Sequence, residues 1–157
     1  MINFDPQDGV GFGALPPEID SLLQQGVVAY RSDRAAAEHL FRAALAAAPE
    51  QLPVYFCLYK IHTYRGDLDE ALSIAEAGLK EAARQTGWGE DLARWPCAPV
   101  AAEGPARFAL YTLKALAFIH LKRGERARAR ALLDALAVLD PEGLVGWPVV
   151  ADLERGM

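Results

Sequence analysis

Apolar residues recur at helical spacing through most of the chain. The first such stretch predicts a helix that begins near Pro17, a residue whose missing N–H costs nothing in the first turn. The apolar positions of this helix are Ile19, Leu22, Leu23, Val27 and Tyr30. A partner helix is predicted from about Asp33 to Ala48, and it stops at Pro49 because proline cannot continue a helix.

Two further helix pairs follow. The second pair begins near Pro53, turns at Gly66 and continues to about Thr86. The third pair begins near Pro105 and ends at Asp140-Pro141, with its turn at Arg123-Gly124-Glu125. A short last helix is predicted from Trp147 to Arg155. We therefore expect six main helices in three antiparallel pairs, a short C-terminal helix and no sheet.

The turn of the second pair carries a helix-start signal. Asp67 precedes the second helix of this pair, and Glu70 follows three residues later, which is the spacing of a capping box. We expect the Asp67 carboxylate to accept hydrogen bonds from the exposed N–H groups of that helix.

Glycine and proline interrupt the helical pattern at two places. Residues 1–16 contain three glycines and two prolines and predict a flexible N-terminal arm. Residues 87–104 predict an insertion, because Gly87-Trp88-Gly89 and Trp95-Pro96 cannot continue a helix. Two alternatives stay open for Trp88 and Trp95: they pack beneath the loop as a small core, or they form a lid or second contact surface.

The chain also partly repeats itself. A shift of 34 residues places Ser32-Asp33 on Gly66-Asp67 and Ala37 on Ala71. Aligning the turn at Arg123-Gly124-Glu125 with Arg65-Gly66-Asp67 gives a third copy at an offset of 58, which is 34 plus 24. The additional residues correspond to the insertion.

This period and its residues resemble the tetratricopeptide repeat family, whose pattern is W-x2-L-G-x2-Y, then A-x3-F, then P. The first unit fits the pattern at Ala37, Phe41, Ala44 and Pro49. In the second unit Tyr55 stands at the tryptophan position, Leu58 at the leucine, His62 at the tyrosine and Ala71 at the first alanine. The third unit holds the pattern at Leu113, Leu116, Ala117, His120, Ala129 and Pro141. Gln25 and Val28 depart from the pattern in the first unit, and the second unit lacks the closing proline. Three units in register favour this fold.

The resemblance implies an all-α domain over residues 17–157, in which the helix pairs stack as a short right-handed superhelix, an α-solenoid. Its repeats would span about 18–51, 52–86 and 110–143, and the helix at 147–155 would cover the last repeat. In this family the first helix of each pair lines a concave groove. The groove positions fall on Tyr30, Phe56, Lys60, Thr63, Tyr64, Lys114, Phe118 and Lys122. Such a mixture of aromatic and basic side chains suits a protein or peptide partner with an acidic or aromatic segment.

Composition narrows the classes of partner. The 157 residues are 52% hydrophobic and 24% charged, as in a packed helical protein. A net charge of −5 argues against nucleic acid, which needs a concentrated basic face. No apolar run reaches the roughly 18 residues that span a bilayer, so we expect a cytoplasmic protein with no membrane partner. The oligomeric state is not indicated.

No catalytic motif is found, and no metal or cofactor is expected. His62 and His120 occupy the same slot of two repeats, where the family pattern has tyrosine, and each is interpreted as a substitute for that ring. Cys57 and Cys97 lack the close spacing of a metal or redox motif and are interpreted as reduced thiols. The leading hypothesis is a non-catalytic adaptor or chaperone. The alternatives are a dedicated secretion chaperone, and a small metal-binding protein or enzyme that uses His62, His120 and Cys57.

Overall fold

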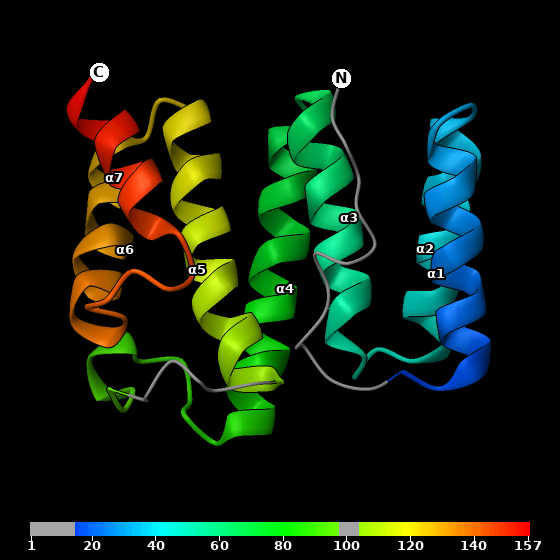
Figure 1. The fold of residues 1–157 in the computed structure, drawn as a ribbon, viewed down its shortest axis with the longest axis horizontal. Coiled ribbons are helices and arrows are strands. Elements are labelled where there is room, and N and C mark those ends of the chain that lie inside the picture. Colours follow the sequence, from blue (N-terminus) through cyan, green and yellow to red (C-terminus); the bar gives the residue numbers. More distant parts are fainter. Residues whose placement is uncertain (1–14, 98–103) are drawn as a thin grey trace.

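Three helix pairs stand side by side along the molecule, and a shorter helix follows the last pair (Figure 1). The computed structural model describes residues 15–97 and 104–157. Within these residues it contains seven α-helices, one short 3-10 helix at Leu92–Arg94 and no strand. The helices are α1 (Pro17–Tyr30), α2 (Arg34–Ala47), α3 (Leu52–Arg65), α4 (Leu68–Thr86), α5 (Pro105–Lys122), α6 (Arg126–Leu139) and α7 (Trp147–Arg155). The predicted all-α fold of paired helices is confirmed.

The turns inside the second and third pairs share one backbone geometry. Gly66 ends α3 with φ +82°, and Gly124 follows α5 with φ +79°, a region that side-chain-bearing residues rarely adopt. In each turn the next N–H donates back to a histidine carbonyl: Asp67 to His62 at 3.0 Å, and Glu125 to His120 at 2.8 Å. These tight reversals make consecutive helices antiparallel.

The predicted cap at Asp67 is wrong. The Asp67 side chain makes no capping hydrogen bond, and one of its oxygens lies 3.4 Å from Nδ1 of His62 and 3.4 Å from Nε of Arg65. Two cationic or polar side chains thus compete successfully with the helix N–H groups for this carboxylate. In the first pair, by contrast, Asp33 does cap α2 and accepts from the N–H of Ala36 at 3.0 Å.

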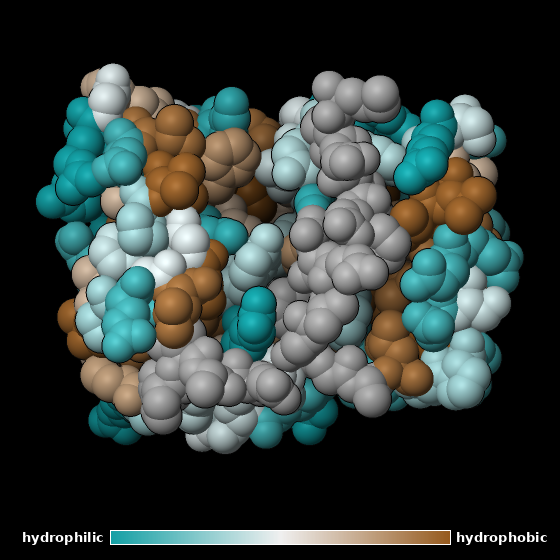
Figure 2. Space-filling view, viewed as in Figure 1, coloured by the Kyte–Doolittle hydropathy of each residue, from teal (hydrophilic) through white to brown (hydrophobic). Residues whose placement is uncertain are grey.

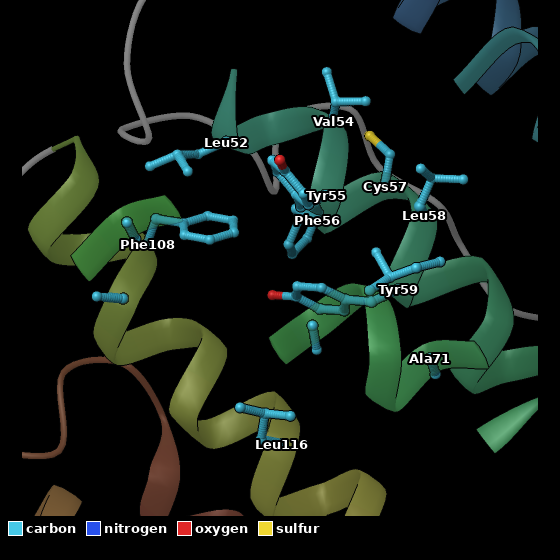
Figure 3. Close-up of a cluster of buried hydrophobic side chains, with 14 of the residues drawn as sticks. Leu52, Val54, Tyr55, Phe56, Cys57, Leu58, Tyr59, Ala71, Phe108 and Leu116 are labelled. Carbon is cyan, nitrogen blue, oxygen red and sulfur yellow. The ribbon is translucent and has the colours of Figure 1, made fainter. Parts of the chain in front are cut away.

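The core is centred on α3, which contacts α2, α4 and α5. All residues from Leu52 to Tyr59 are buried. Phe108 of α5 extends toward Tyr55 and Phe56, and the hydroxyl of Tyr59 points toward α5 (Figure 3). That hydroxyl lies 3.4 Å from Oγ1 of Thr112, in the buried interface of the two helices.

Small residues allow the helices to approach one another closely. Ala37, Ala71 and Ala129, the small positions of the repeat pattern, are fully buried. A Cβ atom on Gly26 would come within 2.4 Å of the Phe41 ring, and one on Gly78 within 2.9 Å of the Tyr55 Cβ. Larger side chains at these positions would therefore force neighbouring helices apart.

The first pair departs from the repeat. Val28 occupies the slot of His62 and His120, yet it is 72% exposed whereas the histidines are 3% and 6% exposed. The neighbouring Val27 and Tyr30 are buried instead. The apolar stripe of α1 lies about 100° around the helix from the slot that the repeat predicts, and burial follows the stripe.

The buried alanines give a test of the packing. We expect Ala71→Leu to lower the free energy of unfolding by about 1–3 kcal/mol, because the contact has no room for a larger side chain. Ala77→Leu is the matched control on the exposed side of the same helix and should change it by less than about 0.5 kcal/mol. Urea unfolding followed by circular dichroism measures both. Equal effects of the two substitutions would contradict the packing described here.

Candidate functional site

A pocket of about 470 Å³ lies between α3, α5 and α7. Each helix contributes one face, because its lining residues are three or four positions apart. The lining residues are Phe56, Tyr59, Lys60, Thr63 and Tyr64 of α3, Tyr111, Lys114, Ala115 and Phe118 of α5, and Gly146, Val149, Val150 and Leu153 at α7. The pocket thus joins three segments that are far apart in the sequence.

Aromatic rings form the floor of this pocket. Phe56 packs edge-to-face against Tyr59, with ring centroids 5.6 Å apart, and against Tyr111 at 5.5 Å. Phe56 and Tyr59 are almost completely buried, so the floor belongs to the core. Burial raises the pKa of Tyr59, whose hydroxyl stays protonated beside Thr112. The floor is therefore rigid and uncharged.

Two lysines supply the charge of the pocket. Nζ of Lys60 lies 5.0 Å from the centroid of the Phe56 ring, and Nζ of Lys114 lies 3.7 Å from that of Tyr111. Both distances fall within the range of cation–π attraction, which holds the ammonium groups against the rings. No described lining residue is a carboxylate. The described lining of the pocket is thus positive, in a chain of net charge −5.

The third wall is apolar and open to solvent. Val149 is 67% exposed and Leu153 is 49% exposed, and both lie on the side of α7 that lines the pocket. Hydrophobic surface gathers over α7 in the space-filling view (Figure 2). Tyr64, on α3, is 44% exposed. Exposed apolar side chains that surround one hollow are typical of an interaction site.

A hydrogen-bonded turn before α7 places this wall. The buried carboxylate of Asp140 accepts from the N–H groups of Leu144 at 3.1 Å and Val145 at 3.0 Å. Nε1 of Trp147 donates to the Asp140 carbonyl at 2.7 Å. Since both oxygens of the carboxylate are used within the turn, the direction in which α7 leaves α6 is determined locally.

Ion pairs then attach α7 to α6. Glu154 is 3% exposed, and its two oxygens lie 2.8 Å from Nε of Arg126 and 3.1 Å from Nη1 of Arg130. The hydrogen bond from Arg126 is the main cause of a lowered pKa for Glu154, and it outweighs the opposing effect of burial. At neutral pH the Glu154 carboxylate is therefore ionised when α7 is packed against α6.

Most of the sequence-predicted groove residues line this pocket. Six of them do so: Phe56, Lys60, Thr63, Tyr64, Lys114 and Phe118. Tyr30 does not; it is buried on α1, and its ring lies 5.5 Å from the guanidinium carbon of Arg34. Lys122 does not either; it is exposed, with Nζ 5.4 Å from the Phe118 ring. The pocket therefore extends across the second and third pairs and excludes the first.

Sequence reasoning missed Tyr59, Tyr111 and the α7 wall. The family pattern directs attention to the first helices of the pairs, and it treats a last helix as a cover. The spacing of Val149 and Leu153, four residues apart on a helix that also carries Trp147, is a signal that could have indicated the wall.

The tryptophans of the insertion pack inward. Trp88 and Trp95 have ring centroids 5.2 Å apart, and Nε1 of Trp95 donates to the Gly89 carbonyl at 2.9 Å. Trp95 is 5% exposed and belongs to the main core, against which Trp88 packs. Neither lines the pocket. Of the two alternatives, this arrangement favours packing beneath the loop. Residues 98–103 of the insertion and 1–14 of the predicted arm lie outside the described residues.

The two histidines are engaged with carboxylates. Nε2 of His62 lies 2.9 Å from Glu38, and Nδ1 of His120 lies 3.1 Å from Glu125. Burial raises the pKa of the Cys57 thiol to about 12, so it is not a thiolate at neutral pH. Within residues 15–97 and 104–157, no group of three or more histidine, cysteine or acidic side chains could hold a metal ion.

None of the described helices is long and apolar enough to cross a membrane. No family model, curated protein or solved structure matches the chain. The fold and the pocket are therefore interpreted from their own geometry.

The attachment of α7 gives a pH-dependent test. Because the pKa of Glu154 is lowered in the folded protein, its contribution to stability is present above the ordinary value of 4.5 and is lost as the pH falls below it. We expect Glu154→Gln to speed hydrogen exchange of the α7 amides at neutral pH, and the difference from the wild type to shrink below pH 4.5. The matched control is Asp152→Asn, an exposed carboxylate on the same helix. A difference that does not change with pH would show that Glu154 acts through packing alone.

Proposed function

We propose that the protein is a non-catalytic module of the tetratricopeptide type, an adaptor or chaperone that acts in the cytoplasm. Its proposed ligand is a segment of another protein, bound in the pocket between α3, α5 and α7. The observation that carries this proposal is the convergence of three helix faces on one hollow with an aromatic floor, two lysines and an exposed apolar wall. Such a surface gains free energy when a partner covers it.

The polar side chains that could perform chemistry support a binding role. His62 contacts Glu38 on α2, His120 contacts Glu125 in the turn after α5, and the Cys57 thiol is buried. Lys60 and Lys114, the charged groups of the pocket, lie over aromatic rings. A long-range attraction from such fixed charges increases the rate at which an acidic partner associates.

Site-specific photo-crosslinking tests where a partner binds. We expect a photoreactive phenylalanine at position 64 to crosslink the partner in cells of the source organism, because Tyr64 is at the edge of the pocket. The same probe at position 138 is the control, because Val138 is even more exposed, at 63%, but lies on α6, outside the pocket. Crosslinks to the same partner from position 138, or from position 88 in the insertion, and none from position 64 would contradict the proposed site.

The affinity for the crosslinked partner provides the energetic test. We expect the double change Tyr64→Ala and Leu153→Ala to weaken binding by about 2 kcal/mol or more, about thirtyfold, because it removes two exposed apolar contacts. Calorimetry measures the affinity, and Val138→Ala is the control. Phe56 is unsuitable for this purpose, since it is 2% exposed and its removal would damage the core. If the double variant binds the partner with unchanged affinity, the pocket is not the binding site.

A further inference from the structure

The walls of the pocket have the spacing of a helix-packing surface. α5 contributes positions 111, 114, 115 and 118, and α7 with the glycine before it contributes positions 146, 149, 150 and 153, so each face spans two turns. At 1.5 Å per residue, two turns correspond to about 10 Å. The α3 face extends one residue further, to Tyr64. Three helix faces of similar length therefore surround a space that a fourth helix would complete.

The polar groups of the pocket disfavour an extended occupant. An extended peptide needs partners for its N–H and C=O groups when it is buried. The walls are helices, whose backbone groups bond internally, and no described lining residue is an asparagine or glutamine that could bond to both groups. The hydroxyl of Thr63 already donates to the Tyr59 carbonyl at 2.6 Å. A helical occupant satisfies its own backbone and needs only side-chain contacts.

We propose that the pocket takes an acidic amphipathic α-helix of a partner protein, which lies against α3, α5 and α7. This inference rests on the proposed function and specifies the class of partner. The apolar side of the ligand helix, with residues at i, i+3 or i+4, and i+7, faces the aromatic floor and contacts Val149 and Leu153. Its aspartate or glutamate residues flank that side and meet Lys60 and Lys114.

Charge complementarity determines the sign of the ligand. Lys60 and Lys114 are the charged residues among the described lining positions, and both are positive. Their ammonium groups lie over the faces of Phe56 and Tyr111, so these faces are occupied by cations and do not favour a cationic ligand. A basic helix would bring like charges together in a partly desolvated site. A carboxylate on the ligand forms the favourable pair.

A displayed library of random 16-residue peptides, selected on the full-length protein, tests this inference. We expect the enriched peptides to carry apolar residues at i, i+3 or i+4, and i+7 with aspartate or glutamate between them, and to gain helical circular dichroism on binding. The affinity of a synthetic copy of one enriched peptide should be at least tenfold lower for the Val149→Glu variant, and at least threefold lower for the charge reversal Lys114→Glu. Val138→Glu and Lys80→Glu are the matched controls outside this pocket and should leave the affinity within twofold.

The possible outcomes separate this inference from the proposed function. Enriched peptides with alternating apolar residues, and with the same sensitivity to Val149→Glu, would overturn the helical ligand but would still support the pocket as the binding site. Enriched lysine or arginine would overturn the acidic ligand. Binding equal in Val149→Glu and the wild type, or no enrichment at all, would overturn both. Self-association of the protein that Val149→Glu abolishes would identify a second copy as the occupant and overturn the acidic partner. If Val149→Glu does not fold, Leu153→Ala makes the same comparison.

Discussion

The burial of α3 on nearly every side is the constraint on which the other features depend. A helix that buries all residues from Leu52 to Tyr59 requires neighbours around it, and α2, α4 and α5 provide them. Close approach of these neighbours needs small residues, which explains Ala71 and Gly78 on α4. Only one side of the last two turns of α3 emerges from the core, because Ile61 and His62 in these turns stay buried. Because these turns carry Lys60, Thr63 and Tyr64, the same packing that stabilises the domain also places one wall of the pocket.

Ion pairs between charged side chains link neighbouring helix pairs in addition to this apolar packing. Arg65, the last residue of α3 before its turn, contacts Glu38 on α2, and Arg123, in the turn after α5, contacts Asp69 on α4. Each turn thus reaches back to the second helix of the preceding pair. Burial alone would raise the pKa of Glu38, but His62 and Arg42 outweigh it and lower the value. Exposed ion pairs contribute little free energy singly, so their main effect here is to specify how neighbouring pairs align.

The sequence determined the helices better than it determined their orientation. Helix ends are marked by local signals such as Pro49, Gly66 and Thr86-Gly87, and these were predicted correctly. Apolar spacing also predicted the buried side of α1 correctly at Ile19, Leu23 and Val27. The repeat alignment nevertheless placed the buried Tyr30 in the groove, because an alignment counts residues and does not register a rotation of the helix about its axis. The pocket was partly predictable because Phe56 and Lys114 occupy repeat positions. Its α7 wall was not, since the direction of that helix depends on how Asp140 folds the turn around its own carboxylate.

The shallow attachment of α7 has a consequence for how the pocket adapts. This helix buries only Val150 and Glu154 fully, whereas α3 and α5 each bury ten residues. Local opening costs less free energy where fewer apolar contacts break, so α7 separates from the domain at a lower cost than α3 or α5 would. Two walls of the pocket are therefore as stable as the domain itself, and the third can separate without unfolding them. A site built in this way can vary its width, and so accept side chains of different size, while its floor keeps one shape.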